Sequence, residues 1–195
     1  MPPRLGRCLA FSAGIDSPVG RLVVSAGEEA ILAIDWGSAE EPPYTPLLAE
    51  ALRQLQAYFT GRLERFDLPL DPKGSAFDRR VWSAMREIPY GKTKSYAAIA
   101  RHLGTSPRAV GGACGRNPIP ILIPCHRIVA SSGLGGYSGG EGLPTKKRLL
   151  ALEAANSAFS GAEPANQTSS PPADEIASTR KPGPDKITIG GSSKD

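Results

Sequence analysis

The segment from Asn117 to Gly140 restricts the fold of this chain more than any other. It reads "NPIPILIPCHRIVASSGLGGYSGG", with three prolines among aliphatic residues, then an adjacent cysteine and histidine, then glycines. Proline fixes its own φ and limits the residue before it, so Cys125 is held on a stiff support. The apolar run "IPILIP" is typical of a short buried strand. The segment therefore predicts a preorganised thiol followed by a glycine-rich loop.

The Cys-His pair is a candidate nucleophile and base. A free thiol has a pKa of about 8.5 and is mostly protonated at neutral pH, so it needs a neighbouring base or positive charge. His126 and Arg127 are candidates. Three alternatives stay open at this point. Cysteine is often buried for packing alone, a zinc site needs about four ligands with a suitable spacing that is absent here, and a cysteine protease needs a histidine from elsewhere, for which only His102 remains.

Length and composition limit the class of protein. The chain has 195 residues and is 40% hydrophobic, enough for one or two modest cores. No apolar run approaches the roughly 20 residues that cross a bilayer, and "MPPRLGRCLAFSAGID" resembles no secretion signal. Cys8, Cys114 and Cys125 form no CxxC motif and no disulfide pattern. We therefore expect free thiols in a protein of the cytoplasm, or of the nucleus in a eukaryote, without membrane association.

The charge of the chain is unevenly distributed. Residues 1–72 hold six Lys and Arg against ten Asp and Glu, a net charge of −4, whereas residues 73–159 hold thirteen against four, a net charge of +9. A compact basic segment is typical of a nucleic-acid-binding domain. A solvated charged surface explains the same charge equally well, so this interpretation needs a motif.

The pattern of apolar residues predicts a small α/β domain at 1–72. The runs "GRLVVSAG" and "AILAIDWG" predict a hairpin of a small antiparallel sheet. A helix is expected after an exposed loop around "AEEPPYTP", with Thr45 as N-cap, apolar residues at three- to four-residue spacing, and Gly61 at its end. At the other end of the chain, residues 160–195 are rich in Ser, Pro and Gly and lack aromatic residues, which predicts a disordered tail.

Residues 73–159 predict a mostly helical, winged-helix-like domain. A first helix places Phe77, Val81, Met85 and Ile88 on one face, and Pro89 ends it. In "SYAAIARHLGTSPRAVGGACG", the first serine caps one helix, Gly104 ends it, and Ser106 with Pro107 starts another after a short turn. This is the pattern of a helix-turn-helix.

The second helix of that motif contains unusually many small residues. They are Gly111, Gly112, Ala113 and Gly115. Each interior glycine costs a helix about 1 kcal/mol relative to alanine, so something must approach this backbone closely. Tight packing against another helix and close contact with a nucleic-acid backbone both remain open.

These segments together resemble the O6-alkylguanine-DNA alkyltransferases. The resemblance rests on "PCHR" with its flanks, on "VWSAMREIPYGKTKSYAAIA", on "SPRAVGGA" and on "KKRLLALE", and it covers about residues 75–155. It implies a monomeric DNA-repair protein that flips a damaged guanine out of double-stranded DNA and transfers the O6-alkyl group to its own cysteine. Each molecule would react once, without cofactor or metal.

The resemblance also implies roles for single residues. Cys125 would accept the alkyl group, and His126 would deprotonate it through a water, oriented by Glu153 on a predicted C-terminal helix. Tyr96 would donate a proton or hydrogen bond toward N3 of the base and crowd the adjacent phosphate. Arg108 would fill the gap left in the base stack. The other implied positions are DNA contacts at Ala109, Gly111, Gly112 and Ala113, and pocket residues at Asn117, Val129, Tyr137, Ser138 and Gly139.

Two other classes of protein share parts of this pattern. Alkyltransferase-like proteins bind the lesion but lack the acceptor cysteine, which is present here as Cys125. A helix-turn-helix transcription regulator would explain the basic half but leaves "PCHR" without a role. Taken singly, Tyr96, Asn117 and Ser138 could have structural roles, and Glu153 could form a surface pair with Lys147 or Arg148.

Overall fold

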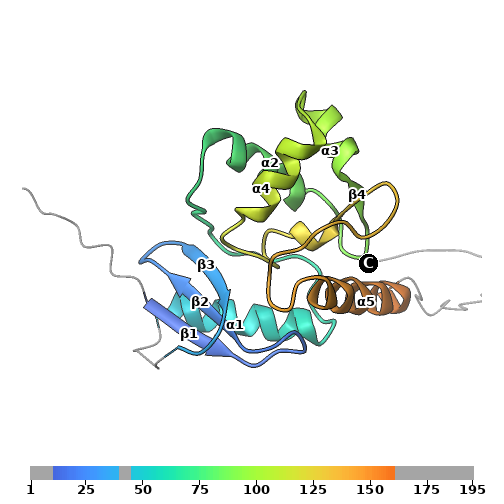
Figure 1. The fold of residues 1–195 in the computed structure, drawn as a ribbon. Helices are drawn as coiled ribbons and strands as arrows, with labels where there is room; N and C mark the ends of the chain where they lie inside the picture. Colours follow the sequence, from blue (N-terminus) through green and yellow to red (C-terminus); the bar gives the residue numbers. More distant parts are fainter. Residues whose placement is uncertain (1–10, 40–44, 161–195) are drawn as a thin grey trace, which may run out of the picture. The chain divides into compact units, whose positions relative to one another are not determined.

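The computed structural model describes residues 11–39 and 45–160, which all belong to one compact unit. It begins with an antiparallel sheet in the order β1-β2-β3, formed by Phe11–Ile15, Leu22–Ala26 and Ile31–Trp36 (Figure 1). The β2-β3 hairpin confirms the two strands predicted from the sequence. Strand β1, with the short sequence "FSAGI", was not predicted. Ser160, the first residue of the predicted tail, ends a helix; the rest of the tail and most of the loop around "AEEPPYTP" lie outside the described residues.

Helix α1, Pro46–Phe59, packs its apolar face against this sheet. The side chain of Thr45 accepts a hydrogen bond from the Leu48 amide, and Gly61 has a φ of +72° just beyond the helix, as the predicted cap and end require. The buried side chain of Gln54 donates to the Asp67 carbonyl and accepts from its amide. This amide clamp fixes the chain that returns from α1 toward the second half of the molecule.

Helix α2, Ala76–Arg86, begins at a capping box formed by Ser75 and Asp78. The predicted helical face is confirmed except at its end, because Ile88 lies beyond the last helical residue although it is buried. The indole of Trp82 is buried and donates to the Ala113 carbonyl at 2.9 Å. Helix α2 is thereby fixed against the helix-turn-helix.

The helix-turn-helix is confirmed residue by residue. Helices α3, Tyr96–Leu103, and α4, Pro107–Gly115, are separated by three residues, and Gly104 takes the left-handed conformation at φ +64°. The hydroxyls of Ser95 and Ser106 cap the two helices. The short strand β4, Lys94–Ser95, pairs in parallel with β5, Ile128–Val129. This pairing joins the start of α3 to the residues just after the Cys-His pair.

The expectation of a strand over "IPILIP" is wrong. The run is buried as predicted, but it forms turns, with Ile121 at φ +76°, and leads into a short 3-10 helix, Cys125–Arg127. Proline has no amide proton for a strand ladder. The Asn117 side chain takes over part of that bonding by donating to the Ile123 carbonyl and accepting from the Ile119 amide. The cysteine therefore sits on a folded-back loop that an asparagine holds together.

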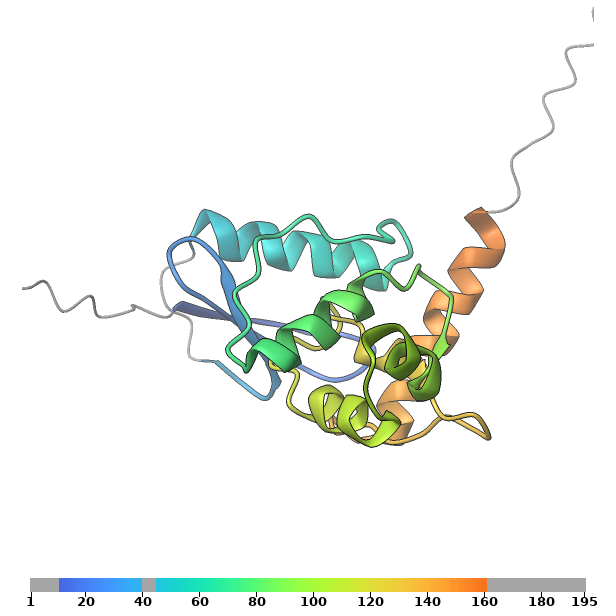
Figure 2. The ribbon, with the colours of Figure 1, turned by 90° about the horizontal axis from the view of Figure 1, so that it is seen from above.

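Helix α5, Leu143–Ser160, lies beside the 3-10 helix and carries Glu153, as predicted (Figure 2). The fold class is confirmed: a small antiparallel sheet with one helix, followed by helices that include a helix-turn-helix. Of the helices described in residues 11–39 and 45–160, none has the length and apolar content that a bilayer requires.

Candidate active site

A cavity of about 730 Å³ opens between the helix-turn-helix and the glycine-rich loop. Its volume lies within the range of small-molecule sites, which bind ligands in mostly apolar clefts. Six residues expected at the site line it: Tyr96, Arg108, Gly111, Cys125, Tyr137 and Ser138. His126 and Glu153 lie behind it and are fully buried. The remaining expected residues do not line the cavity: Ala109, Gly112, Ala113, Asn117, Val129 and Gly139.

The acceptor candidate Cys125 is 7% exposed and is a free thiol. Burial raises the pKa of this thiol, while the Asn117 side chain and the positive charge of Lys146 act in the opposite direction. The effect of burial on the pKa is the larger one, because the hydration that a thiolate loses stabilises it more than the contacts with these partners do. At neutral pH the sulfur therefore keeps its proton until a base removes it.

His126 is suited to be that base. Its Nε2 lies 2.8 Å from Oε1 of Glu153, and Nδ1 has no hydrogen-bond partner among the groups that the structure describes. Burial lowers the pKa of the imidazole, although the contact with Glu153 raises it. A carboxylate accepts hydrogen bonds, so Nε2 carries the proton and Nδ1 presents a lone pair. The neutral imidazole can take up one proton at Nδ1 and share the resulting charge with Glu153.

Glu153 is a buried carboxylate with donors on both oxygens. Its carboxylate accepts hydrogen bonds from Tyr58, from the Gly91 amide and from Arg127. Burial raises its pKa, but the bonds and charges of His126 and Arg127 outweigh that effect and bring the pKa to about 2. The surface pair considered from the sequence is wrong, because Arg148 pairs with Glu141 instead. Glu153 stays ionised and keeps its charge beside the imidazole.

Lys146 organises the cavity wall and was not identified from the sequence. Although it is a lysine, it is fully buried, and its ammonium donates to three carbonyls. The acceptors are Ile128, Leu134 and Gly136. The three bonds hold the loop that forms one side of the cavity. No local pattern distinguishes this lysine from the exposed Lys147 beside it.

The N-terminal sheet supports the glycine-rich loop through Trp36. The indole nitrogen donates to the Val19 carbonyl at 2.9 Å, which fixes the ring. A Cβ built on Gly139 would lie 2.6 Å from this ring, closer than real contacts allow. Gly139 is therefore needed for the approach of Trp36 rather than for the cavity surface.

The glycines of α4, unlike Gly139, are not required by a close contact with another part of the described structure. A Cβ on Gly111 would make an ordinary contact of 3.9 Å with Tyr96, and one on Gly115 would meet open space. One on Gly112 would meet only the end of the flexible Arg116 side chain. Packing inside the described structure thus does not explain these glycines. Ala113, by contrast, is fully buried and contributes to the core, which leaves its side chain no outer surface.

Tyr96 and Arg108 also line the cavity. Burial raises the pKa of Tyr96 to about 12, so its hydroxyl remains a hydrogen-bond donor at neutral pH. Arg108 is exposed in the first turn of α4, and Ser138 is exposed on the opposite wall. A second thiol, Cys114, also lines the cavity, and burial raises its pKa to about 12. The cavity thus has a buried thiol, a candidate base next to it in sequence, and hydrogen-bond donors among its lining residues.

Comparisons with known proteins cover nearly the whole described chain. Residues 76–155 match the family described as 6-O-methylguanine DNA methyltransferase, DNA binding domain, and residues 11–72 match its ribonuclease-like domain. A methylated-DNA--protein-cysteine methyltransferase of Mycolicibacterium paratuberculosis is 47% identical over 152 residues, which are 71% of this chain and 89% of the relative. A constitutive one of Bacillus subtilis is 41% identical over 152 residues, again 71% of this chain and 92% of the relative.

Solved structures agree with these sequence matches. The Mycobacterium tuberculosis O6-methylguanine methyltransferase superposes with a TM-score of 0.69 at 38% identity, covering 82% of this chain and 98% of that one. The Mycobacterium tuberculosis OGT in complex with DNA has a TM-score of 0.67 at 42% identity, covering 75% and 94%.

Replacement of Gly139 by alanine is expected to displace either Trp36 or the loop. The added methyl group would enter the indole ring, whereas the same change at Gly136 meets no atom within 4 Å. We expect Gly139→Ala to lower the midpoint of thermal unfolding and shift tryptophan fluorescence, and Gly136→Ala to change neither. Equal behaviour of the two variants would contradict the contact.

Glu153 is expected to make stability depend on pH in acid. Its pKa is about 2 in the folded protein against an ordinary value of 4.5, so its stabilising effect is complete above about 4.5 and is lost as the pH falls toward 2. We expect the free energy of unfolding, measured in urea, to fall below about pH 4.5. Glu153→Gln should be less stable at neutral pH but show a shallower fall in acid; an unchanged slope would contradict this account.

Proposed function

The chain belongs to the 6-O-methylguanine DNA methyltransferase family, and we propose on this basis that it repairs DNA by transferring the alkyl group of O6-alkylguanine to Cys125. The observation that carries the proposal is the arrangement around the cavity. A free thiol lies at its wall, and a neutral imidazole with an unpartnered nitrogen is held behind it by an ionised carboxylate. This is the arrangement that activates a cysteine for attack. The protein is thus a methylated-DNA--protein-cysteine methyltransferase, a DNA-repair transferase that acts once.

The proposed reaction moves one proton and one alkyl group. The Cys125 thiol passes its proton through a water to Nδ1 of His126, and Glu153 balances the imidazolium charge. The thiolate attacks the alkyl carbon, so that a carbon–sulfur bond forms while the carbon–O6 bond breaks. The departing guanine carries the negative charge, which the Tyr96 hydroxyl stabilises at N3. The stable thioether on Cys125 makes the reaction stoichiometric, without a cofactor.

The target base must leave the duplex to reach the thiol. Buried in a cavity wall, Cys125 cannot contact a stacked base, and enzymes that act on bases solve this by base flipping. We propose that α4 enters the minor groove and that the exposed Arg108 takes the place of the flipped base. Gly111 and Gly112, whose small size internal packing does not require, permit a close approach of the DNA backbone, with Ala109 beside them. The net charge of +9 on residues 73–159 supports binding to phosphates.

The flipped base is proposed to lie between Tyr137, Ser138 and the wall near Val129. Tyr137 and Ser138 line the cavity directly, and Val129 is followed by Ala130, which also lines it. Gly139 and Asn117 act from behind, the first by admitting Trp36 and the second by holding the cysteine loop. One copy of the chain supplies the thiol, the imidazole and the carboxylate, so the proposed reaction needs no second copy, and we propose that the protein acts as a monomer.

We propose a division into an α/β domain, 1–72, and a DNA-binding and acceptor domain, 73–159. The family matches end at residue 72 and begin again at residue 76, which supports this boundary. A protein that needs a reduced thiol and genomic DNA is expected in the cytoplasm, or in the nucleus of a eukaryote. A regulator or a lesion-flagging protein would have no use for a buried Cys-His-Glu arrangement, which favours the transferase.

The proposal is tested by intact-protein mass spectrometry after incubation with a duplex containing one O6-methylguanine. We expect the wild-type protein to gain the mass of one methylene group, mapped to Cys125, and Cys125→Ala to gain nothing. Cys114→Ala is the matched control, because it removes the other thiol of the cavity and should leave the transfer intact. Tight lesion-selective binding without a mass change would overturn the transferase assignment.

The α4 glycines are expected to lower the stability of the protein but to strengthen its binding to DNA. Gly111→Ala has room inside the protein and should stabilise it by about 0.5–1 kcal/mol, yet weaken binding to a lesion-containing duplex severalfold. Ser83→Ala, in an exposed position of α2, is the control: it should improve helix propensity without changing affinity. Unchanged affinity of Gly111→Ala would remove this helix from the proposed DNA surface. Thermal unfolding and fluorescence anisotropy measure the two effects.

A further inference from the structure

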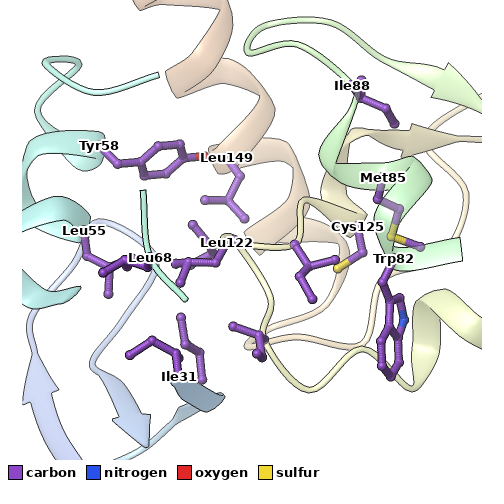
Figure 3. Packing of buried hydrophobic residues seen from close by; sticks show 14 of the residues in the cluster. Ile31, Leu55, Tyr58, Leu68, Trp82, Met85, Ile88, Leu122, Cys125 and Leu149 are labelled. Carbon is purple, nitrogen blue, oxygen red and sulfur yellow. The ribbon is translucent and has the colours of Figure 1, made fainter. Parts of the chain in front are cut away.

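Tyr58 brings a functional group from the N-terminal part of the chain to the catalytic carboxylate. It lies in α1, is fully buried, and donates its hydroxyl proton to Oε1 of Glu153 at 2.8 Å. Figure 3 shows its side chain directed from α1 toward α5, where Leu149 lies. The same carboxylate oxygen contacts His126 Nε2. Tyr58 is therefore connected to the base through a single shared oxygen atom, although neither its sequence surroundings nor the family resemblance identified it.

We propose that Tyr58 is a positioning residue for alkyl transfer: its hydroxyl fixes the orientation of the Glu153 carboxylate and weakens the interaction of that carboxylate with His126. The inference rests on the proposed function, and it makes the N-terminal domain a direct participant in proton transfer. Tyr58 itself touches neither the DNA nor the reacting sulfur in this scheme. Its action passes through Glu153 to His126.

Packing alone does not account for the hydroxyl. The ring packs edge-on against Phe59 and Tyr90, at 5.2 Å and 5.8 Å between centroids, and against Phe66 at 5.2 Å. A phenylalanine would make the same ring contacts. A buried hydroxyl is unfavourable without a partner, and the partner here is the same carboxylate that contacts the base. Burial, and then the nearby charge of Glu153, raise the pKa of Tyr58, so it remains a donor throughout the working pH range.

The groups around Glu153 and His126 determine how the Tyr58 hydroxyl affects the protonation of His126. Arg127 donates to both carboxylate oxygens and the Gly91 amide donates to Oε2. Among the residues that the structure describes, Tyr58 is thus the one neutral side chain besides the imidazole that contacts Oε1. Arg127 and Lys146 oppose protonation of His126, whereas Glu153 favours it. Tyr90 also senses the charge of Glu153, but its hydroxyl accepts a hydrogen bond from Asn156 instead.

Removal of the Tyr58 hydroxyl is expected to raise the pKa of His126. Without the Tyr58 donor, Oε1 of Glu153 interacts more strongly with the imidazolium, so the pKa of His126 rises. The base is then protonated, and inactive, at a higher pH than in the wild type. A purely structural defect would instead lower the rate by the same factor at every pH.

The test measures single-turnover methyl transfer from a duplex with one O6-methylguanine as a function of pH. We expect Tyr58→Phe to move the acid limb of the rate profile upward by about half to one pH unit, so that the rate on that limb falls about three- to tenfold while the plateau changes less. Tyr90→Phe is the matched control, since it removes a hydroxyl from the same aromatic cluster without touching Glu153. Its acid limb should coincide with that of the wild type.

The outcomes separate this inference from the proposed function. A wild-type protein that transfers no methyl group overturns the proposed function itself. A transferring wild type with an unshifted acid limb in Tyr58→Phe overturns the role of Tyr58 alone, as does an equal shift in Tyr90→Phe. Thermal unfolding of both variants establishes that they are compared as folded proteins.

Discussion

The buried carboxylate of Glu153 is the interaction on which the rest of this structure depends. A charge in a protein interior is tolerated only when other groups replace its lost hydration. Here the replacement comes from Tyr58 on α1, the amide of Gly91 after α2, and His126 and Arg127 on the 3-10 helix. These three segments, and α5 that carries Glu153, must all be in place before the carboxylate is satisfied. Folding of the chain therefore brings together the residues that we propose as the base and its partner.

The cavity beside this network depends on groups that stand behind its walls. Lys146 gathers three carbonyls of the loop after Cys125, and Trp36 supports the same loop from the N-terminal sheet at Gly139. Asn117 holds the preceding turn in place of a strand ladder. A loop rich in glycine would otherwise be mobile, because glycine loses the most conformational freedom on ordering. These contacts allow a pocket that is lined in part by a glycine-rich loop to keep a defined shape.

Helix α4 contains glycines that lower its stability and that therefore suggest a functional reason for their presence. Three of its residues are glycines at which an added Cβ would meet an ordinary contact, open space or only the movable end of the Arg116 side chain. A helix selected for stability alone would place alanine there. The basic charge of the surrounding segment and the exposed Arg108 on the same helix are the observations from which we propose that the DNA backbone occupies this space.

The sequence alone determined the elements whose signals are local. Thr45, Ser95 and Ser106 cap helices through bonds to residues three positions away, and Gly104 ends α3, so these boundaries needed no tertiary information. The adjacent Cys125 and His126 were equally visible, and Glu153 followed from the family resemblance. The apolar run before Cys125 was misjudged because burial gives a strand and a folded-back loop the same composition.

Only the tertiary structure decided which distant side chains complete the site. Tyr58 reaches Glu153 across 95 positions in sequence, and Lys146 is buried while its neighbour Lys147 is exposed. Nothing within a few residues of Tyr58, Lys146 or Trp36 distinguishes them from ordinary core or surface residues. Their roles arise from where the chain brings buried donors and acceptors together, and that placement depends on the packing of the whole core rather than on any local pattern.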